Sequence, residues 1–219
     1  YNQPISAIQF YAINAQTLIK ESSDIDALDN MSRIEELTKR MASLTNSLRN
    51  FAHKPEQKRK KIQISTVIDQ LVILMQPRLK TENVELIINH SKHDLTVMAG
   101  STRLTQILSN LIANSIDALK GQSQKTITLE YLANNTETVE IYIKDNGPGI
   151  PVDQREKLYE AFYTTKSNQD GLGLGLFIVY NLLNELGGKL DIIDEKDYGA
   201  VFRIELERHD QEETNNDRT

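Results

Sequence analysis

The apolar residues of this chain change their spacing near residue 55, and that change divides the fold. In the first part they recur at intervals of three and four residues in two runs: Ile5, Ile8, Ala12, Ala15 and Ile19, then Ile34, Leu37, Met41, Leu44, Leu48 and Phe51. Such spacing is typical of the seam of a coiled coil or a helical bundle. The polar stretch ESSDID between the runs supplies turn and N-cap residues. Residues 1–54 are therefore predicted to form a helical hairpin.

A hairpin of this kind leaves apolar surface uncovered, because two helices alone bury only one stripe each. A second copy of the chain would complete the core as a four-helix bundle, so a homodimer is predicted. The alternative is that the hairpin docks against another part of its own chain.

Beyond Pro55 and a basic linker over residues 55–60, strands and helices alternate. Strands are predicted at residues 61–64, 84–88, 95–99, 126–132, 138–144, 189–193 and 200–206, and helices at 66–79, 102–120 and 174–187, with a helical turn near 153–160. Strands with helices over one face indicate an α/β sandwich over residues 61–207. The tail, residues 208–219, lacks apolar periodicity and is predicted to be disordered. The chain as a whole belongs to the α+β class.

The composition excludes several kinds of protein. With no cysteine, the 219-residue chain has neither disulfides nor thiolate metal sites. A net charge of −6 argues against nucleic acid as a partner, and the local cluster Lys54, Lys58, Arg59, Lys60 and Lys61 is interpreted as a solvated linker. Apolar runs fall short of the roughly 18 residues that span a bilayer, so a soluble chain without membrane contact is predicted.

Three glycines, Gly171, Gly173 and Gly175, stand at the start of an apolar pattern that begins at Leu174 and recurs every four residues. The run predicts a buried helix, which places the glycines at its N-terminus. Unpaired backbone N–H groups and the helix dipole favour an anion there, and glycine lets a phosphate approach closely. The functional interpretation is a phosphate site, and the alternative is a flexible loop that leads into a core helix.

A polar stripe runs along the helix predicted at residues 102–120. Asn110, Asn114 and Asp117 are spaced i, i+4 and i+7, so they share one face. Asparagine is a poor residue for a helix interior, and its neutral oxygen suits Mg²⁺ beside a polyphosphate. The stripe fits a magnesium site, and it fits a solvated helix face equally well.

Asp145 ends a predicted strand and opens the sequence Asp-Asn-Gly-Pro-Gly, which contains Gly147 and Gly149. A tight turn accounts for the glycines. The carboxylate at the strand end could accept a hydrogen bond from an exocyclic amine such as that of adenine. Further along, the polar segment AFYTTKSNQD contains Phe162 and Lys166, and the lysine could offer its charge to a phosphate.

In this order, the segments resemble the GHKL superfamily, which comprises the ATP-binding domains of gyrase, heat-shock chaperones, histidine kinases and mismatch-repair proteins. LTQILSNLIANSIDAL looks like the N box, KDNGPGI like the G1 box, EAFYTTK like the F box and DGLGLGL like the G2 box of sensor histidine kinases. The resemblance covers residues 61–207 and implies ATP and Mg²⁺ as cofactors.

The resemblance also implies roles for particular residues. Asn114 would coordinate Mg²⁺, Asn110 would help to position the phosphates or the metal's waters, and Asp145 would read adenine. The other nucleotide-binding residues would be Asp117, Gly147, Gly149, Phe162, Lys166, Gly171, Leu172, Gly173, Leu174 and Gly175. Where the superfamily's ATPases have a glutamate that activates water, this chain has Asn110, which cannot act as a general base and so favours phosphoryl transfer over hydrolysis. Val201 stands where many relatives have a threonine near adenine.

The first residues, YNQPISAIQFYAINAQ, resemble the histidine-box helix of sensor kinases of the C4-dicarboxylate and nitrogen-regulation type. The family motif reads His-Glu-x-Asn-Gln-Pro, and residues 1–4 match its last four places. The phosphoacceptor histidine is thus expected two residues before Tyr1, so the box would be truncated in this chain. By the same resemblance, Gln3 would hold a water that dephosphorylates the regulator. The four histidines of the chain, His53, His90, His93 and His209, lie outside the motif and are interpreted as ordinary surface or linker residues.

Together these resemblances imply the cytoplasmic core of a two-component sensor histidine kinase, whose intact form can be anchored in the inner membrane. Such a core transfers the γ-phosphoryl group of Mg-ATP to a histidine and then to an aspartate of a response-regulator receiver domain. In that reaction Asn110 and Lys166 would act at the phosphates. The alternative is a non-catalytic dimeric interaction module whose conformation is set by the bound nucleotide.

Overall fold

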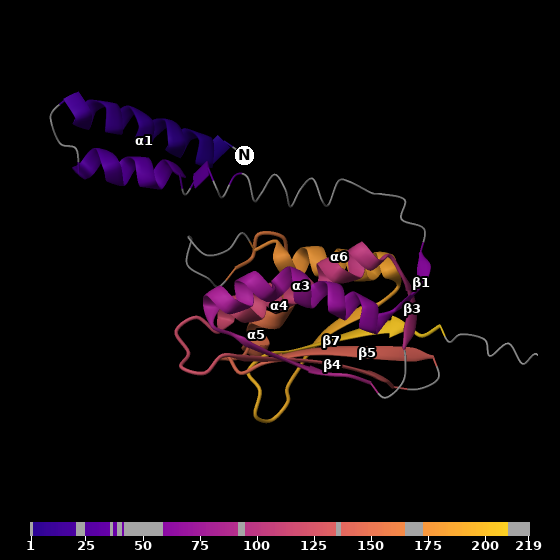
Figure 1. The fold of residues 1–219 in the computed structure, drawn as a ribbon. Helices are drawn as coiled ribbons and strands as arrows, with labels where there is room; N and C mark the ends of the chain where they lie inside the picture. Colours follow the sequence, from indigo (N-terminus) through magenta and orange to yellow (C-terminus); the bar gives the residue numbers. More distant parts are fainter. Residues whose placement is uncertain are drawn as a thin grey trace, which may run out of the picture. The chain divides into compact units, whose positions relative to one another are not determined.

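The computed structural model describes residues 2–20, 25–35, 37–38, 41, 59–91, 95–134, 137–164 and 173–209. The chain divides into two compact units, Tyr1–Pro55 and Glu56–Thr219. The first contains helices, and the second combines helices with a sheet (Figure 1). This arrangement confirms the predicted α+β class.

Two helices lie side by side in the first unit (Figure 1). Helix α1 spans Asn2–Lys20, and residues 25–35, 37–38 and 41 are also helical. Ala15 and Ala27 are buried, and the Arg33 guanidinium donates a hydrogen bond of 3.5 Å to the Tyr11 hydroxyl while it lies over the Tyr11 ring. These contacts join the helices as a hairpin. The seam positions Leu44, Leu48 and Phe51 lie outside the described residues.

Apolar side chains of the hairpin are exposed both at a predicted seam position and outside the predicted seam. Ile19, which the spacing places in the seam, is 55% exposed. Large apolar side chains are exposed on both helices: Phe10, Ile13, Ile19, Ile25, Leu28 and Met31. The unit alone therefore does not bury the apolar surface that its sequence provides.

In the second unit, helices cover one face of a five-stranded sheet (Figure 1). The elements are β1 (Lys60–Gln63), α3 (Ile64–Glu82), β2 (Glu85–Asn89), β3 (Thr96–Ala99), α4 (Ser101–Ala118), β4 (Thr126–Ala133), β5 (Thr138–Asp145), α5 (Val152–Arg155), the 3-10 helix η1 (Glu156–Tyr159), α6 (Gly175–Leu186), β6 (Lys189–Ile193) and β7 (Val201–Glu207). The sheet order is β2-β4-β5-β7-β6, and β1 pairs with β3 in a separate two-stranded sheet. Strand β2 runs parallel to β4, whereas β4, β5, β7 and β6 are antiparallel to their neighbours.

Alternation along β5 decides which of its side chains reach the helices. Val139, Ile141 and Ile143 are fully buried in the core that α3, α4 and α6 share with the sheet. Because side chains in a strand alternate between faces, Asp145 continues this series and faces the helix layer. The same strand thus provides both the core and the carboxylate of the predicted site.

The predicted linker and the predicted disordered tail each contain residues that the structure shows to be ordered. Lys60 begins β1, and the Arg59 guanidinium donates a hydrogen bond to the carbonyl oxygen of Glu185 near the end of α6. At the other end, the N–H groups of Arg208 and His209 donate to the carbonyls of Glu137 and Thr96 at 2.7 Å and 2.8 Å. Residues that look solvated in the sequence are therefore held by backbone acceptors distant in the chain.

Candidate nucleotide site

Asp145 is the most enclosed polar group of the predicted site, with 1% of its surface exposed. Its Oδ1 accepts hydrogen bonds from the N–H groups of Gly147 at 3.0 Å and Ala200 at 3.1 Å. Its Oδ2 accepts one from the Ser115 hydroxyl at 2.8 Å. A buried carboxylate needs such donors, because an unpaired charge in the interior is costly. The fold therefore prepares Asp145 before any ligand is bound.

The turn after Asp145 packs directly against the start of β7. A side chain at Gly199 would overlap the backbone of Gly147, including its carbonyl oxygen. Gly149 has a φ of +80°, and a Cβ there would lie 3.1 Å from the carbonyl oxygen of Gly199. Gly149 and Gly199 are thus required by close backbone approach, whereas a Cβ on Gly147 would lie 3.0 Å from Oδ1 of Asp145. Gly199 is a glycine of this contact that the sequence reasoning missed.

Ala200, rather than Val201, meets Asp145. Besides the Ala200 N–H bond to Oδ1, the Asp145 N–H donates to the Ala200 carbonyl at 3.0 Å. Val201 precedes Phe202, which lies in the core facing the helices, so strand alternation directs Val201 to the other face of the sheet. The position compared with the family's threonine is therefore one residue away from the carboxylate.

At the other end of the site, Asn114 lies against the first residue of α6. A Cβ on Gly175 would be 3.2 Å from Oδ1 of Asn114 and 3.4 Å from its Nδ2. Helix α6 begins at Gly175 after the buried Leu174, and no side chain caps its N-terminus. Asn110 lies one turn earlier on α4 and, like Asn114, is partly buried. Neither amide has a hydrogen-bond partner among the residues that the structure describes. Asn114 of the polar stripe and Gly175 thus meet where phosphate binding is predicted.

The F-box and G2-box segments also meet. The Phe162 N–H donates to the Gly173 carbonyl at 3.0 Å. Phe162 and Gly173 have positive φ values of 70° and 63°, and a Cβ on Gly173 would collide with the backbone of residues 162–163. Lys166, Gly171 and Leu172 lie outside the described residues. Gln3 lies in α1, but the structure does not describe its side chain.

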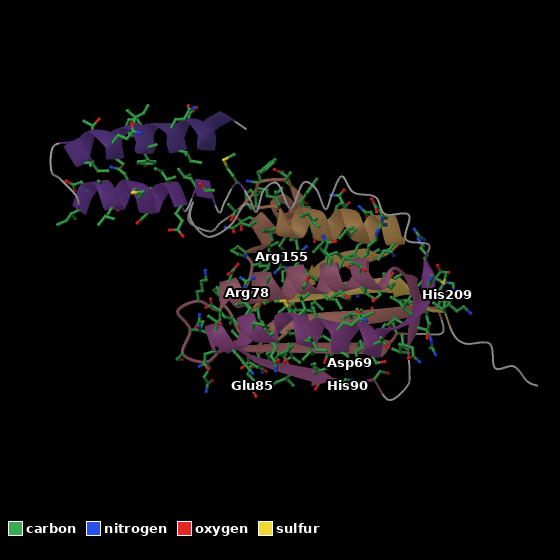
Figure 2. The ribbon with its side chains drawn as sticks, turned by 45° about the horizontal axis from the view of Figure 1, so that its top comes forward. Asp69, Arg78, Glu85, His90, Arg155 and His209 are labelled. Atoms are coloured by element: carbon green, nitrogen blue, oxygen red, sulfur yellow. The ribbon has the colours of Figure 1, made fainter. Side chains whose placement is uncertain are left out.

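Asp117 is engaged in ion pairs. The Arg78 guanidinium of α3 donates to Oδ1 of Asp117 at 2.8 Å, and the Lys120 ammonium lies 3.6 Å from the same oxygen. Figure 2 labels Arg78 on its helix. Asp117 is 14% exposed, so these cations neutralise a carboxylate on the asparagine face of α4. The separation of 39 positions between Arg78 and Asp117 explains why the sequence reasoning missed this pair.

Arg155, also labelled in Figure 2, ties the turn to the neighbouring β6 end. Its guanidinium donates to the Ile150 carbonyl, at 3.2 Å from both Nε and Nη2, and to the Asp194 carboxylate. The hydrogen bond from Arg155 lowers the pKa of Asp194 below its ordinary value. Arg155 therefore supports the backbone that follows Gly149.

The residues present fit one magnesium ion held mainly by a nucleotide. Within the described ranges, no group of three or more His, Cys, Asp or Glu side chains gathers to hold a metal. Mg²⁺ often takes only one or two protein oxygens and keeps waters and phosphate oxygens as its other ligands. The unpartnered amide of Asn114 suits that role.

The fold and the site define an ATP-binding domain of the GHKL type, and comparison with known proteins agrees. Residues 99–210, just over half of the chain, match the model of the histidine kinase-, DNA gyrase B- and HSP90-like ATPase family. The chain therefore belongs to this family, and the predicted membership of the GHKL superfamily is confirmed.

Three similar proteins, one sensor protein and two solved structures, each match most of this chain. The C4-dicarboxylate transport sensor protein DctB of Pseudomonas aeruginosa is 37% identical over 205 residues, which are 94% of this chain and 34% of that protein. Full-length ShkA in complex with AMPPNP superimposes with a TM-score of 0.67 at 28% identity, over 84% of this chain and 39% of the other. The complex of histidine kinase ThkA with response regulator protein TrrA shares the fold, with a TM-score of 0.70 at 22% identity over 95% of this chain and 59% of the other.

This chain spans about a third of the length of the curated relatives it matches. Every helix in the described part of the chain is too short or too polar to cross a membrane.

Proposed function

We propose that the second unit binds Mg-ATP and donates the γ-phosphoryl group to a histidine of the protein that contains this unit. The contact between Asn114 and Gly175 carries this proposal. It brings an unpartnered amide oxygen to the N-terminus of α6, where backbone N–H groups attract phosphate. Asp145 lies on the face of β5 that is covered by the helices, and its carboxylate would accept a hydrogen bond from the exocyclic amine of adenine. One site would thus hold both ends of the nucleotide.

The phosphate end would be completed by residues in named roles. Asn114 would hold Mg²⁺, Asn110 would help to orient the phosphates, and Lys166 with the glycines at 171, 173 and 175 would contact the phosphate oxygens. When bound, the ion supplies charge neutralisation at the transferring phosphoryl group. The chain's own contribution is positioning, because neither asparagine can take a proton from water. Transfer to a protein acceptor is therefore favoured over hydrolysis.

The first unit is proposed to form a homodimer through a four-helix bundle. Its exposed apolar side chains, including Phe10, Ile13 and Leu28, support this assignment because a second hairpin could cover them. In the proposed reaction a histidine that precedes Tyr1 accepts the phosphoryl group and passes it to a receiver-domain aspartate. Gln3 would position the water for the reverse, dephosphorylating step. The similarity to DctB, a sensor protein, and the ThkA complex with a response regulator support the partner class. The lack of cysteine suits the reducing cytoplasm.

Calorimetry with Mg-ADP tests the nucleotide site. Asp145→Asn should weaken ADP binding by roughly 1.5 to 3 kcal/mol, because it removes a charged acceptor for the adenine amine. The matched control is Asp153→Asn, which changes an exposed aspartate on α5. Equal ADP affinity in the Asp145 variant and the wild type would refute the adenine assignment.

The transfer step needs a separate experiment. The chain is extended at its N-terminus by His-Glu and, as a control, by Gln-Glu, and each is incubated with radiolabelled ATP. Acid-labile label should appear only on the histidine version and should move to a receiver domain when one is added. If both versions bind ATP and neither is labelled, the chain is a nucleotide-dependent interaction module instead.

A further inference from the structure

Ser115 is buried beside the carboxylate proposed to read adenine. It follows Asn114 on α4, is 1% exposed, and its hydroxyl donates to Oδ2 of Asp145 at 2.8 Å. Successive residues of a helix point roughly 100° apart. Asn114 can therefore face Gly175 while Ser115 faces Asp145, so one turn of α4 serves both ends of the site.

The two oxygens of Asp145 are occupied unequally. A carboxylate offers about four lone-pair positions, two on each oxygen. Oδ1 accepts two backbone N–H groups, from Gly147 and Ala200. Among the described residues, Oδ2 accepts only the Ser115 hydroxyl. Oδ2 therefore retains a lone pair for a further donor, whereas Oδ1 is saturated.

We propose that Oδ2 of Asp145 accepts the adenine amine and that Ser115 is the positioning residue that holds this oxygen in place. The inference rests on the proposed function, in which Asp145 meets adenine. Backbone donors fix Oδ1, but they leave the carboxylate free to tilt about it. The Ser115 hydroxyl fixes the second oxygen and so sets the direction of the remaining lone pair. Base selectivity then depends on a side chain that does not touch the base.

A pair of ligands isolates this effect. ADP carries the exocyclic amine, and purine riboside 5′-diphosphate is the same molecule without it. The ratio of their dissociation constants reports the amine contact alone, since the phosphates and ribose are common to both. Losing one hydrogen bond to a charged acceptor corresponds to roughly a tenfold change in this ratio.

The variants are chosen to have matched shapes. Ser115→Thr and Ser115→Val fill nearly the same volume, but only threonine keeps the hydroxyl. Ser109→Ala is the control on the same helix, because the Ser109 hydroxyl donates to the Gln106 carbonyl at 3.0 Å and not to Asp145. Calorimetry with both ligands is run on the full chain, and thermal melting compares the stability of the threonine and valine variants.

We expect the wild type, Ser115→Thr and Ser109→Ala to prefer ADP, and Ser115→Val to lose most of that preference through weaker ADP binding. Affinity for purine riboside diphosphate should stay the same. If Ser115→Val keeps the preference for ADP, Ser115 does not position the carboxylate. The same conclusion follows if Ser115→Val fails to fold and the folded Ser115→Thr binds ADP no more tightly than purine riboside diphosphate. If the wild type itself does not prefer ADP, the proposed adenine contact fails first, which separates the two hypotheses.

Discussion

The two ends of the candidate site are built differently. At the adenine end, Asp145 is enclosed and accepts three hydrogen bonds from the protein itself. At the phosphate end, the amides of Asn110 and Asn114 have no partner in the described part of the chain, and α6 begins without a side-chain cap. At the first end the protein already occupies most of the acceptor positions of Asp145 and leaves one lone pair of Oδ2, whereas the second end keeps its amides and helix N–H groups available for a ligand.

The difference fits the part of the nucleotide that each end is proposed to recognise. Selecting one base requires a rigid acceptor whose direction is fixed, which burial and multiple donors provide. Binding phosphate and Mg²⁺ requires N–H groups and oxygens that are not already satisfied by the protein. Substitutions at the adenine end should therefore reduce both stability and binding, whereas substitutions at the phosphate end should separate the two.

The largest effect is expected from Gly199→Ala at the adenine end. The new methyl group would overlap the Gly147 backbone, so the turn must move and Asp145 loses its donors. We expect a decrease of about 3 kcal/mol in the free energy of unfolding, typical of overpacking, together with loss of ADP binding. Denaturant unfolding and calorimetry measure the two quantities.

Gly121→Ala is the control for this substitution. Gly121 has a φ of +84°, but nothing lies within 4 Å of a Cβ placed there. It should lose only about 1 kcal/mol from backbone strain and keep its ADP affinity. If the two variants behave alike, close packing of Gly199 on Gly147 is not what supports the adenine end.

Gly175→Ala tests the opposite behaviour at the phosphate end. Alanine favours the helical conformation by up to about 1 kcal/mol over glycine, which should offset a tight contact with Asn114. Stability should therefore be unchanged or higher. ADP affinity should fall about tenfold, because the methyl group blocks phosphate from the helix N-terminus, while adenosine affinity stays constant. A parallel loss of ADP and adenosine binding would show that the two ends are not independent.

The Arg78–Asp117 pair offers a third, smaller test. If Asp117 lines the phosphate site, Arg78→Ala removes a guanidinium that neutralises the Asp117 carboxylate, so this carboxylate repels the nucleotide more strongly. ATP affinity should fall roughly fivefold, and less at high salt because the charges are partly exposed. The double variant with Asp117→Asn should recover the affinity. Calorimetry measures ATP binding by the wild type, the two single variants and the double variant. If the double variant bound ATP no better than Arg78→Ala, the charge of Asp117 would not explain the loss.

The sequence predicted this site best where its signals are local. The spacing of Asn110 and Asn114, the glycines before α6 and the strand that ends at Asp145 each follow from a few neighbouring residues, and the helices and strands lie within a few residues of their predicted bounds. The missed contacts are those set by pairing between distant strands and helices. Ala200 reaches Asp145 only because β7 pairs with β5. No local pattern carries that register, so neither Gly199 nor Ser115 could be recognised as part of the site.

The smallest effect is expected at the Arg155–Asp194 pair, which supports the Ile150 carbonyl after the adenine-end turn. The hydrogen bond from Arg155 lowers the pKa of Asp194, so the folded state favours the ionised carboxylate. The resulting stabilisation is fully present above the unfolded pKa of aspartate and is lost as the pH falls through the lower, folded value. Asp194 is 79% exposed, so solvent screens the pair and its contribution is small. Asp194→Asn should therefore melt slightly below the wild type at neutral pH and together with it in acid, whereas Asp153→Asn should follow the wild type throughout. A difference between Asp194→Asn and the wild type that persists unchanged into acid would assign the effect to packing of the turn rather than to the charge of Asp194.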